Sequence, residues 1–258
     1  MIDLHCHIIP QIDDGAWNAA TACAMARHAW RSGVDTIVAT PHCNLAGARP
    51  NYRDHDYFTI LAMFRALLKQ HGIPLKVLPG SEVFVHPGNI RELIENRKIV
   101  TLNHSRYLLV EFSFGTHGQS MCHLLDAIAR RGLIPVVAHP ERYDAVQDQP
   151  DLVARWFAQG YIIQLNKGSL LGRLGQSARQ CAMHLLQNGL AHVIASDAHD
   201  MKYRPPGFQS LIPALEPYIG REYLKLLLVD NPKRIISDQP IPKPHKIPEN
   251  TYFAEEET

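Results

Sequence analysis

The sequence predicts an α/β protein built on a parallel sheet, and three observations lead to this prediction. Short apolar runs recur along the chain, longer amphipathic stretches separate them, and many of those stretches end in a glycine. Strands that alternate with helices form parallel sheets with right-handed crossovers, either open or closed into a barrel. In both arrangements functional sites lie at the carboxyl ends of the strands.

The predicted elements follow one another in order. The runs predicted as strands are residues 2–6, 35–40, 76–78, 107–112, 134–138, 161–165 and 192–195. Apolar residues recur at helical spacing in residues 19–31, 55–70, 121–131, 152–158 and 178–188, which predicts helices there. The glycines that fit helix ends are Gly33, Gly72, Gly132, Gly160 and Gly189.

Composition is typical of one globular domain. The 258 residues are 46% hydrophobic and 20% charged, and a net charge of +1 gives no indication of a nucleic-acid or membrane partner. Five cysteines without paired spacing, no signal-peptide pattern and no bilayer-length apolar stretch predict a cytoplasmic protein. We expect residues 1–236 to form the domain, and residues 237–258, rich in proline, lysine and glutamate, to form an extended tail.

Two histidines stand at the end of the first predicted strand. His5 and His7 are two residues apart, so both rings point to one face of the strand and can reach one point. Imidazole is costly to bury without partners, and neutral imidazole is the commonest protein ligand of zinc-like metals. Asp13 and Asp14 follow within a few residues. This strand end therefore predicts the first part of a metal site.

Nearly every later strand also leads into a histidine or a carboxylate. The full set of candidate ligands is His5, His7, Asp14, His42, Glu82, Glu111, His139, Asp197 and His199. A catalytic zinc-type ion uses about three protein ligands plus water, so this set suits two or three ions with one bridging carboxylate. The mixture of imidazole and carboxylate suits Mn, Fe or Zn and does not choose among them.

The competing interpretation is that each of these residues is a surface residue or a satisfied core residue. Glu111 resists that interpretation most, because it lies inside the apolar run 107–112, where a carboxylate needs a partner. For the competing interpretation to hold, a histidine or carboxylate would have to occur by coincidence at each of six strand ends. A metal cluster explains all six together and is therefore favoured.

Two arginines closely follow candidate ligands. Arg142 comes just after His139, and Arg204 follows His199 in a proline-containing loop. A guanidinium offers a planar fork of donors suited to phosphate, and a bound anion would offset its repulsion from a metal cluster. Asn166 and Lys167, after the sixth predicted strand, could donate to the same anion.

The sequence also contains the H-C-x5-R spacing of cysteine-dependent phosphatases, from Cys43 to Arg49. In those enzymes a thiolate of low pKa attacks phosphorus from a loop that leads directly into a helix. Here a proline and an asparagine intervene before the next helical pattern, which counts against this route. Cys6 lies between two candidate ligands and, by alternation, should point away from them as a packed thiol.

The chain resembles the PHP (polymerase and histidinol phosphatase) superfamily in its motifs H-C-H, D-D-G, T-P-H, G-S-E, E-F-S, A-H-P-E-R, L-N-K-G-S, S-D-A-H and D-N-P-K-R-I. It is most similar to the manganese-dependent protein-tyrosine phosphatases of bacterial capsule and exopolysaccharide clusters, over residues 1 to about 236. The resemblance implies a distorted (β/α)7 barrel (PHP fold) that holds three ions, with Mn²⁺ expected and Fe or Zn as alternatives. Cys6 stands where a serine is usual, which removes no ligand.

The resemblance also implies a role for each candidate residue. One ion would be held by His5, His7, Glu82 and Asp197, a second by Glu82, Glu111 and His139, and a third by Asp14, His42 and His199. Arg142 and Arg204 fall on the phosphate-binding arginines of the family. In the implied mechanism a metal-bridging water of lowered pKa attacks phosphorus in line, and no phosphoenzyme forms.

The implied substrate is a phosphotyrosine protein, namely the tail of an autophosphorylated bacterial tyrosine kinase. One alternative is a PHP phosphatase of a small metabolite such as histidinol phosphate, or a nucleic-acid phosphodiesterase. Near-neutral charge counts against nucleic acid. The other alternative is a regulatory metal-binding module without activity, against which the complete ligand set counts.

Overall fold

Short parallel strands form two sheets in the computed structural model, which describes residues 1–242. The first sheet has the order β1 (Ile2–Cys6), β2 (Thr36–Ala39) and β4 (Lys76–Pro79). The second has the order β3 (His42–Cys43), β5 (Glu82–Phe84), β6 (Tyr107–Glu111), β7 (Ile134–Ala138), β8 (Ile162–Asn166) and β9 (Val193–Ala195). All pairings between these strands are parallel, so the molecule is a mixed α/β protein with parallel sheets, as predicted.

The chain passes from the first sheet to the second at two breaks, which the sequence did not predict. Thr40 and Pro41 separate β2 from β3, and Gly80 and Ser81 separate β4 from β5. Proline lacks the N–H that a central strand needs, so pairing stops there. At Gly80 the backbone packs so closely that an added Cβ would lie 2.6 Å from Val38 Cγ1. The breaks bring His42 and Glu82 to the ends of short strands beside each other.

The first strand and the segment after the last strand lie side by side. The Asp197 N–H donates to the His5 carbonyl at 2.8 Å, and the His7 N–H donates to the Ala198 carbonyl at 2.8 Å. A parallel bridge joins Cys6 and Ala198. The two ends of the chain's strand series therefore meet at the carboxyl ends of β1 and β9.

One apolar cluster draws residues from strands of both sheets. It contains Ile2, Leu4, Val38, Leu78, Leu109, Val136, Ile162 and Val193, all buried. Alternate residues of a strand share a face, so the face that carries Leu109 also carries Glu111, and the face that carries Ile162 also carries Gln164. Apolar packing at one end of the strands thus gives way to polar side chains at the carboxyl ends.

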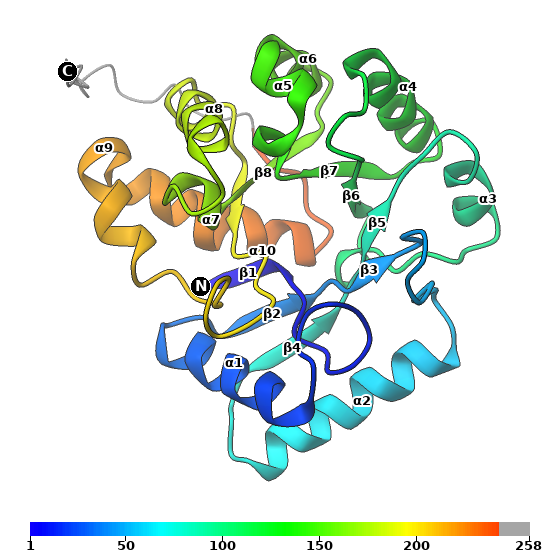
Figure 1. The fold of residues 1–258 in the computed structure, drawn as a ribbon, viewed down its shortest axis with the longest axis vertical. Helices are drawn as coiled ribbons and strands as arrows, with labels where there is room; N and C mark the ends of the chain where they lie inside the picture. The colour runs from blue at the N-terminus through cyan, green and yellow to red at the C-terminus, as the bar shows by residue number, and fades with distance from the viewer. Residues whose placement is uncertain (243–258) are drawn as a thin grey trace.

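Helices surround the strands in Figure 1 and cover their outer faces with the larger apolar cluster. They are α1 (Ala19–Arg31), α2 (His55–Gln70), α3 (Ile90–Glu95), α4 (Gly118–Ala129), α5 (Asp144–Asp148), α6 (Asp151–Ala158), α7 (Lys167–Leu170), α8 (Gln176–Gln187), α9 (Leu211–Lys225) and α10 (Asn231–Ile236). The five glycines predicted at helix ends all have positive φ, as a left-handed terminus requires. Among the described residues, no helix combines the length and the apolar character needed to cross a bilayer.

Some helices were not predicted from the sequence, and the physical reasons are clear. Helices α3, α5, α7 and α10 have six residues or fewer, too few to establish a period. Helix α9 contains Pro217 and is kinked at Gly220, where φ is 76°. Both residues are signals against a helix when only the sequence is considered.

The start of the predicted tail packs against β6. Asp238 accepts a hydrogen bond from the Arg106 N–H at 2.8 Å, and the Tyr107 hydroxyl donates to the Gln239 carbonyl at 2.7 Å. Ile241 packs against the apolar cluster that joins the two sheets. The rest of the predicted tail, residues 243–258, lies outside the described residues.

Candidate metal centre

The carboxyl ends of the strands enclose a small polar cavity of about 170 Å³. It is lined by Asp14, His42, Glu82, Glu111, Phe114, His139, Arg142, Asp197, His199 and Arg204. His5 and His7 lie beneath it and are fully buried. All nine predicted ligands and both predicted arginines therefore come together in one place, although they originate from seven separate segments of the chain.

The rings of His5 and His7 are held so that their Nε2 atoms face each other, 3.2 Å apart. His5 Nδ1 donates to the Gln164 side-chain oxygen at 2.9 Å, and His7 Nδ1 donates to Asp13 Oδ2 at 2.7 Å. With the proton on Nδ1, each neutral ring presents a lone pair on Nε2. Two facing lone pairs at this distance require a cation or a proton between them.

Glu82 lies at the centre of the cluster and contacts four imidazoles. Its Oε1 lies 3.2 Å from His5 Nε2 and 3.0 Å from His139 Nε2. Its Oε2 lies 3.3 Å from His7 Nε2 and 3.0 Å from His42 Nδ1. A carboxylate that reaches different imidazoles with its two oxygens has the geometry of a bridge between two ions.

A second group forms at the exposed edge of the centre. Asp14 Oδ1 lies 3.4 Å from His42 Nε2 and 3.4 Å from His199 Nε2. The His199 ring also stacks on the His7 ring, with centroids 3.8 Å apart. These four residues could hold one ion, and further groups of three ligands surround Glu82 and Asp197.

Asp197 separates the histidines from the arginines. Its Oδ1 faces His5 and His199, at 3.4 and 3.5 Å. Its Oδ2 lies 3.5 Å from Arg142 Nη1 and 3.4 Å from Arg204 Nη1. Asp197 thus places two partly buried guanidinium groups directly beside the imidazole cluster.

The protonation of the centre also fits a cation. Burial lowers the pKa of His5, but the carboxylates of Glu82 and Asp197 outweigh it and raise that pKa to about 9. Burial and the negative charge of Glu82 raise the pKa of Glu111 to about 8. Without an ion, protons therefore offset the excess negative charge, and a bound divalent cation would displace them.

Two residues of the centre have left-handed backbones although neither is glycine. His139 has φ 34° and Asp197 has φ 49°. Such conformations cost on the order of 1–3 kcal/mol and persist where the surrounding structure enforces them. Here each one lies within two residues of the end of a strand and precedes a segment whose arginine lines the cavity.

Two residues outside the predicted ligand set support its members. Asp13 accepts hydrogen bonds from the His7 ring, from the His42 N–H at 3.0 Å and from the Gly15 N–H at 3.0 Å. Gln164 orients His5 by a hydrogen bond and is a buried amide in an apolar strand. Like Glu111, it is a polar side chain in an apolar run and needs a partner, so it could have been predicted for the same reason. Asp13 carried no such signal, because its neighbour Asp14 was an equal candidate.

The side chains of Asn166 and Lys167 donate hydrogen bonds to protein groups and not to the predicted anion site. Asn166 Nδ2 donates to Asp197 Oδ2 at 2.7 Å. The buried Lys167 ammonium donates to the carbonyls of Pro205 and of Gly207, the latter at 2.9 Å. Asn166 therefore orients a residue of the centre, and Lys167 supports the loop that carries Arg204.

The alternative cysteine site does not form. Cys43 is buried, and burial raises the pKa of its thiol to about 12, the opposite of an activated nucleophile. Arg49 is paired with the Asp56 carboxylate at 3.7 Å. Cys6 is likewise buried, with its sulfur 3.8 Å from the Ala198 carbonyl, as expected for a packed thiol.

The chain is similar in sequence to a family of known proteins. Residues 1–237 match the family model described as capsular polysaccharide synthesis, CpsB/CapC. The tyrosine-protein phosphatase YwqE of Bacillus subtilis (strain 168) is 36% identical over 241 residues, which cover 93% of each chain. The tyrosine-protein phosphatase CpsB of Streptococcus pneumoniae is 33% identical over 245 residues, which cover 93% of this chain and 99% of that protein.

A solved structure also superposes on this chain. It was reported for YwqE from Bacillus subtilis and CpsB from Streptococcus pneumoniae as unique metal-dependent tyrosine phosphatases. The TM-score is 0.86 at 34% sequence identity, and the match covers 96% of this chain and 99% of that one. The family model spans nearly all of the described residues, and the chain belongs to the CpsB/CapC family of capsular polysaccharide synthesis.

Proposed function

We propose that this protein is a metal-dependent protein-tyrosine phosphatase, which hydrolyses the phosphomonoester of phosphotyrosine in proteins. The observation that carries the proposal is the arrangement around Asp197. One of its oxygens faces imidazoles that fit a cation, and the other faces two arginines that fit the oxygens of a phosphoryl group. The relatives that share most of the chain are named tyrosine-protein phosphatases.

The fold that we propose for this function is a distorted (β/α)7 barrel formed by residues 1–236. Two observations support it: the bridge between Cys6 and Ala198, and the apolar cluster that both sheets share. Residues 237–242, the described start of the predicted tail, would then lie outside the barrel and pack on β6.

The proposed ligand sets are those that the family resemblance implies. His5, His7, Glu82 and Asp197 hold one ion; Glu82, Glu111 and His139 hold the second; and Asp14, His42 and His199 hold the third. The groupings by proximity support this division in part, because His7 also lies with the third set and His5 with Glu82 and His139. Mn²⁺ is the proposed ion, and Fe or Zn would suit the same donors.

Each residue then has a defined task in hydrolysis. When bound, the ions supply an activated water and neutralise charge on the phosphoryl group. Arg142 and Arg204 donate to the phosphoryl oxygens and stabilise the charge that they gain in the transition state. Asp13, Gln164 and Asn166 fix the orientation of His7, His5 and Asp197.

The proposed partner is an autophosphorylated bacterial tyrosine kinase, whose phosphorylated tail would be the substrate, and the proposed location is the cytoplasm. Residues 1–242 contain all five cysteines, and none of these is in a disulfide. Unpaired, mostly buried thiols are in keeping with a reducing compartment.

A turnover panel tests the proposed function. The protein, with its metal content measured on the same sample, is offered a phosphotyrosyl peptide, histidinol phosphate and a nucleotide phosphodiester. We expect the peptide to be preferred, a chelator to abolish its hydrolysis and Mn²⁺ to restore it. Preference for either other substrate, or activity that survives complete removal of metal, would contradict the proposal.

Replacing Asp13 by asparagine should weaken metal binding. The His7 ring would keep a hydrogen-bond acceptor but lose the negative charge that makes its Nε2 a better ligand. Loss of such a supporting group typically lowers metal affinity by about 10- to 100-fold. Titration against a competing chelator measures the change, and the exposed Asp151→Asn is the control. If the metal affinity of Asp13→Asn is unchanged, the role of Asp13 is limited to holding the turn at Gly15.

Replacing Cys43 by serine should leave phosphatase activity nearly unchanged. The thiol is buried and its pKa is raised, so it takes no part in attack on phosphorus. The measurement is kcat/KM for a phosphotyrosyl peptide together with metal content. An inactive Cys43→Ser protein with its full complement of metal would instead support the thiolate route.

A further inference from the structure

Phe114 is a large apolar side chain that remains exposed beside the centre. It lies in the loop between β6, which ends at Glu111, and α4. It lines the same cavity as Arg142, yet 41% of it is accessible to solvent. An aromatic ring that lines a cavity beside polar groups can pack against a bound ligand.

The contacts of Phe114 hold its ring in place. The guanidinium carbon of Arg142 lies 4.5 Å from the ring centroid, which is a cation–π arrangement. The ring also lies edge-on to His139, with centroids 6.4 Å apart, and near Tyr143 at 6.2 Å. The ring therefore forms a fixed wall between a proposed ligand, a phosphate-binding arginine and solvent.

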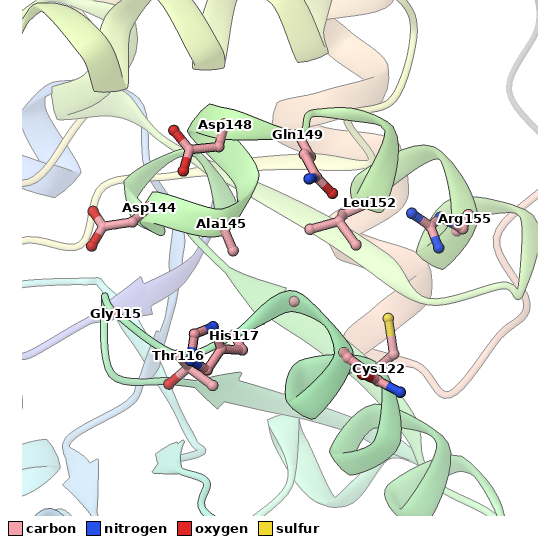
Figure 2. A pocket seen from close by; sticks show the side chains of 12 residues that line it. Gly115, Thr116, His117, Cys122, Asp144, Ala145, Asp148, Gln149, Leu152 and Arg155 are labelled. Carbon is pink, nitrogen blue, oxygen red and sulfur yellow. The ribbon is translucent and has the colours of Figure 1, made fainter.

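A larger cavity of about 830 Å³ begins next to Phe114. In Figure 2, Thr116 and His117 form one wall and face Ala145 and Leu152 across the cavity. The Asp144 N–H donates to the Phe114 carbonyl at 3.1 Å, which joins the two walls at the end nearest the centre. Phe114 therefore stands where the small metal cavity meets the larger one.

The two cavities differ in what they can contain. The centre, at about 170 Å³, has room for ions and a phosphoryl group but none for a peptide. In phosphotyrosine a phenyl ring separates phosphorus from the main chain, so the ring must pass the mouth and the main chain must lie outside it. The larger cavity provides that outside surface, and its polar walls can pair with peptide groups.

We propose that Phe114 packs against the phenyl ring of the phosphotyrosyl residue and that the cavity of Figure 2 binds the residues next to it in the substrate chain. This inference rests on the proposed function and deepens it. Phe114 would favour aromatic phosphoesters, because an aromatic ring can pack against its ring and an aliphatic phosphoester cannot. The cavity is the determinant of peptides over free phosphotyrosine.

The first test replaces Phe114 by alanine in the metal-loaded protein. We expect kcat/KM for free phosphotyrosine and for a phosphotyrosyl peptide to fall about tenfold, the usual worth of an aromatic pair. Inhibition by inorganic phosphate, which has no ring, should be unchanged, and Phe114→Tyr should retain activity. The control is Trp30→Ala, since Trp30 is equally exposed at 41% but lies at the end of α1.

The second test blocks the cavity with Gln149→Trp, because the Gln149 side chain points into it in Figure 2. The kcat/KM of the peptide should fall to that of free phosphotyrosine, because only the peptide has residues that enter the cavity. Gln187→Trp, at the exposed end of α8, is the control.

Each part of the inference can fail separately. If Phe114→Ala weakens phosphate inhibition as much as it lowers turnover, the ring only positions Arg142. The proposed packing of Phe114 against the phenyl ring of the substrate would then be wrong. If Gln149→Trp leaves the peptide advantage intact, the cavity is not a subsite. If the wild-type protein hydrolyses neither tyrosyl substrate, the proposed function itself fails.

Discussion

Replacing His139 or His5 by alanine lowers the metal content of the purified protein and reduces kcat/KM for a phosphotyrosyl peptide on the order of a thousandfold. Each ring faces Glu82, so its loss removes a ligand beside the carboxylate that contacts four imidazoles. Ions supply several kcal/mol of transition-state charge stabilisation, which corresponds to this loss in rate. Metal analysis and steady-state kinetics on the same preparation provide the measurement.

The same variants separate metal binding from folding. Their ion-free forms should still unfold in one cooperative transition, because the apolar clusters are untouched, but at a lower denaturant concentration than the ion-free wild-type protein, because a buried imidazole is lost. Adding Mn²⁺ should raise the free energy of unfolding of the wild-type protein by about 2.7 kcal/mol when the ion is a hundredfold above its Kd. The increase should be smaller in the two variants. His184→Ala, on the exposed side of α8, is the matched control. Full metal occupancy in both His5→Ala and His139→Ala would overturn the assignment of the centre.

Replacing Arg142 or Arg204 by alanine reduces turnover with the ions still in place. Loss of a charge-assisted donor to a transition-state oxyanion costs about 3 kcal/mol, roughly a hundredfold in rate. The ions should remain, because the Asp197 oxygen that faces the arginines still has the Asn166 amide as a donor at 2.7 Å. Lysine at either position should restore activity only in part, since it keeps the charge but lacks the planar fork.

The double variant provides a further check on the arginines. Both guanidinium groups approach the same oxygen of Asp197, so their contributions should not be independent. We expect Arg142→Ala combined with Arg204→Ala to lose less than the product of the two single losses. Single variants with wild-type kcat/KM for a phosphotyrosyl peptide would remove the arginines from the site, leaving phosphate binding to the ions.

The positions of the candidate ligands could be predicted because they depend on topology alone. Parallel strands place their carboxyl ends on one side of a sheet, so His5, Glu111 and Asp197 were expected on the same side, and the bridge between Cys6 and Ala198 brings the first and last of them together. The assignment of each ion to a ligand set depends instead on side-chain distances, and the sequence contains no information on these beyond a family resemblance.

Other features were beyond the sequence for physical reasons. Strands β3 and β5 have two and three residues, so neither shows an alternating pattern. Asp13 and Asp14 are chemically identical neighbours, and only the fold decides that the first supports His7 while the second faces His42 and His199. The sequence does not distinguish Phe114 from the other aromatic residues, whereas its exposure and its contact with Arg142 do.

The meeting of the first strand with the segment after the last has a consequence for the order of folding. The centre joins His5 and Asp197, which lie at opposite ends of the domain in sequence. Contacts between such distant residues form late, because closing the intervening chain costs entropy that only a nearly complete sheet repays. A growing chain therefore cannot complete the ion-binding cluster until its ninth strand has been synthesised and docked. An ion that binds only the completed cluster would stabilise only fully folded molecules. Ion occupancy would therefore report complete folding as well as catalytic competence.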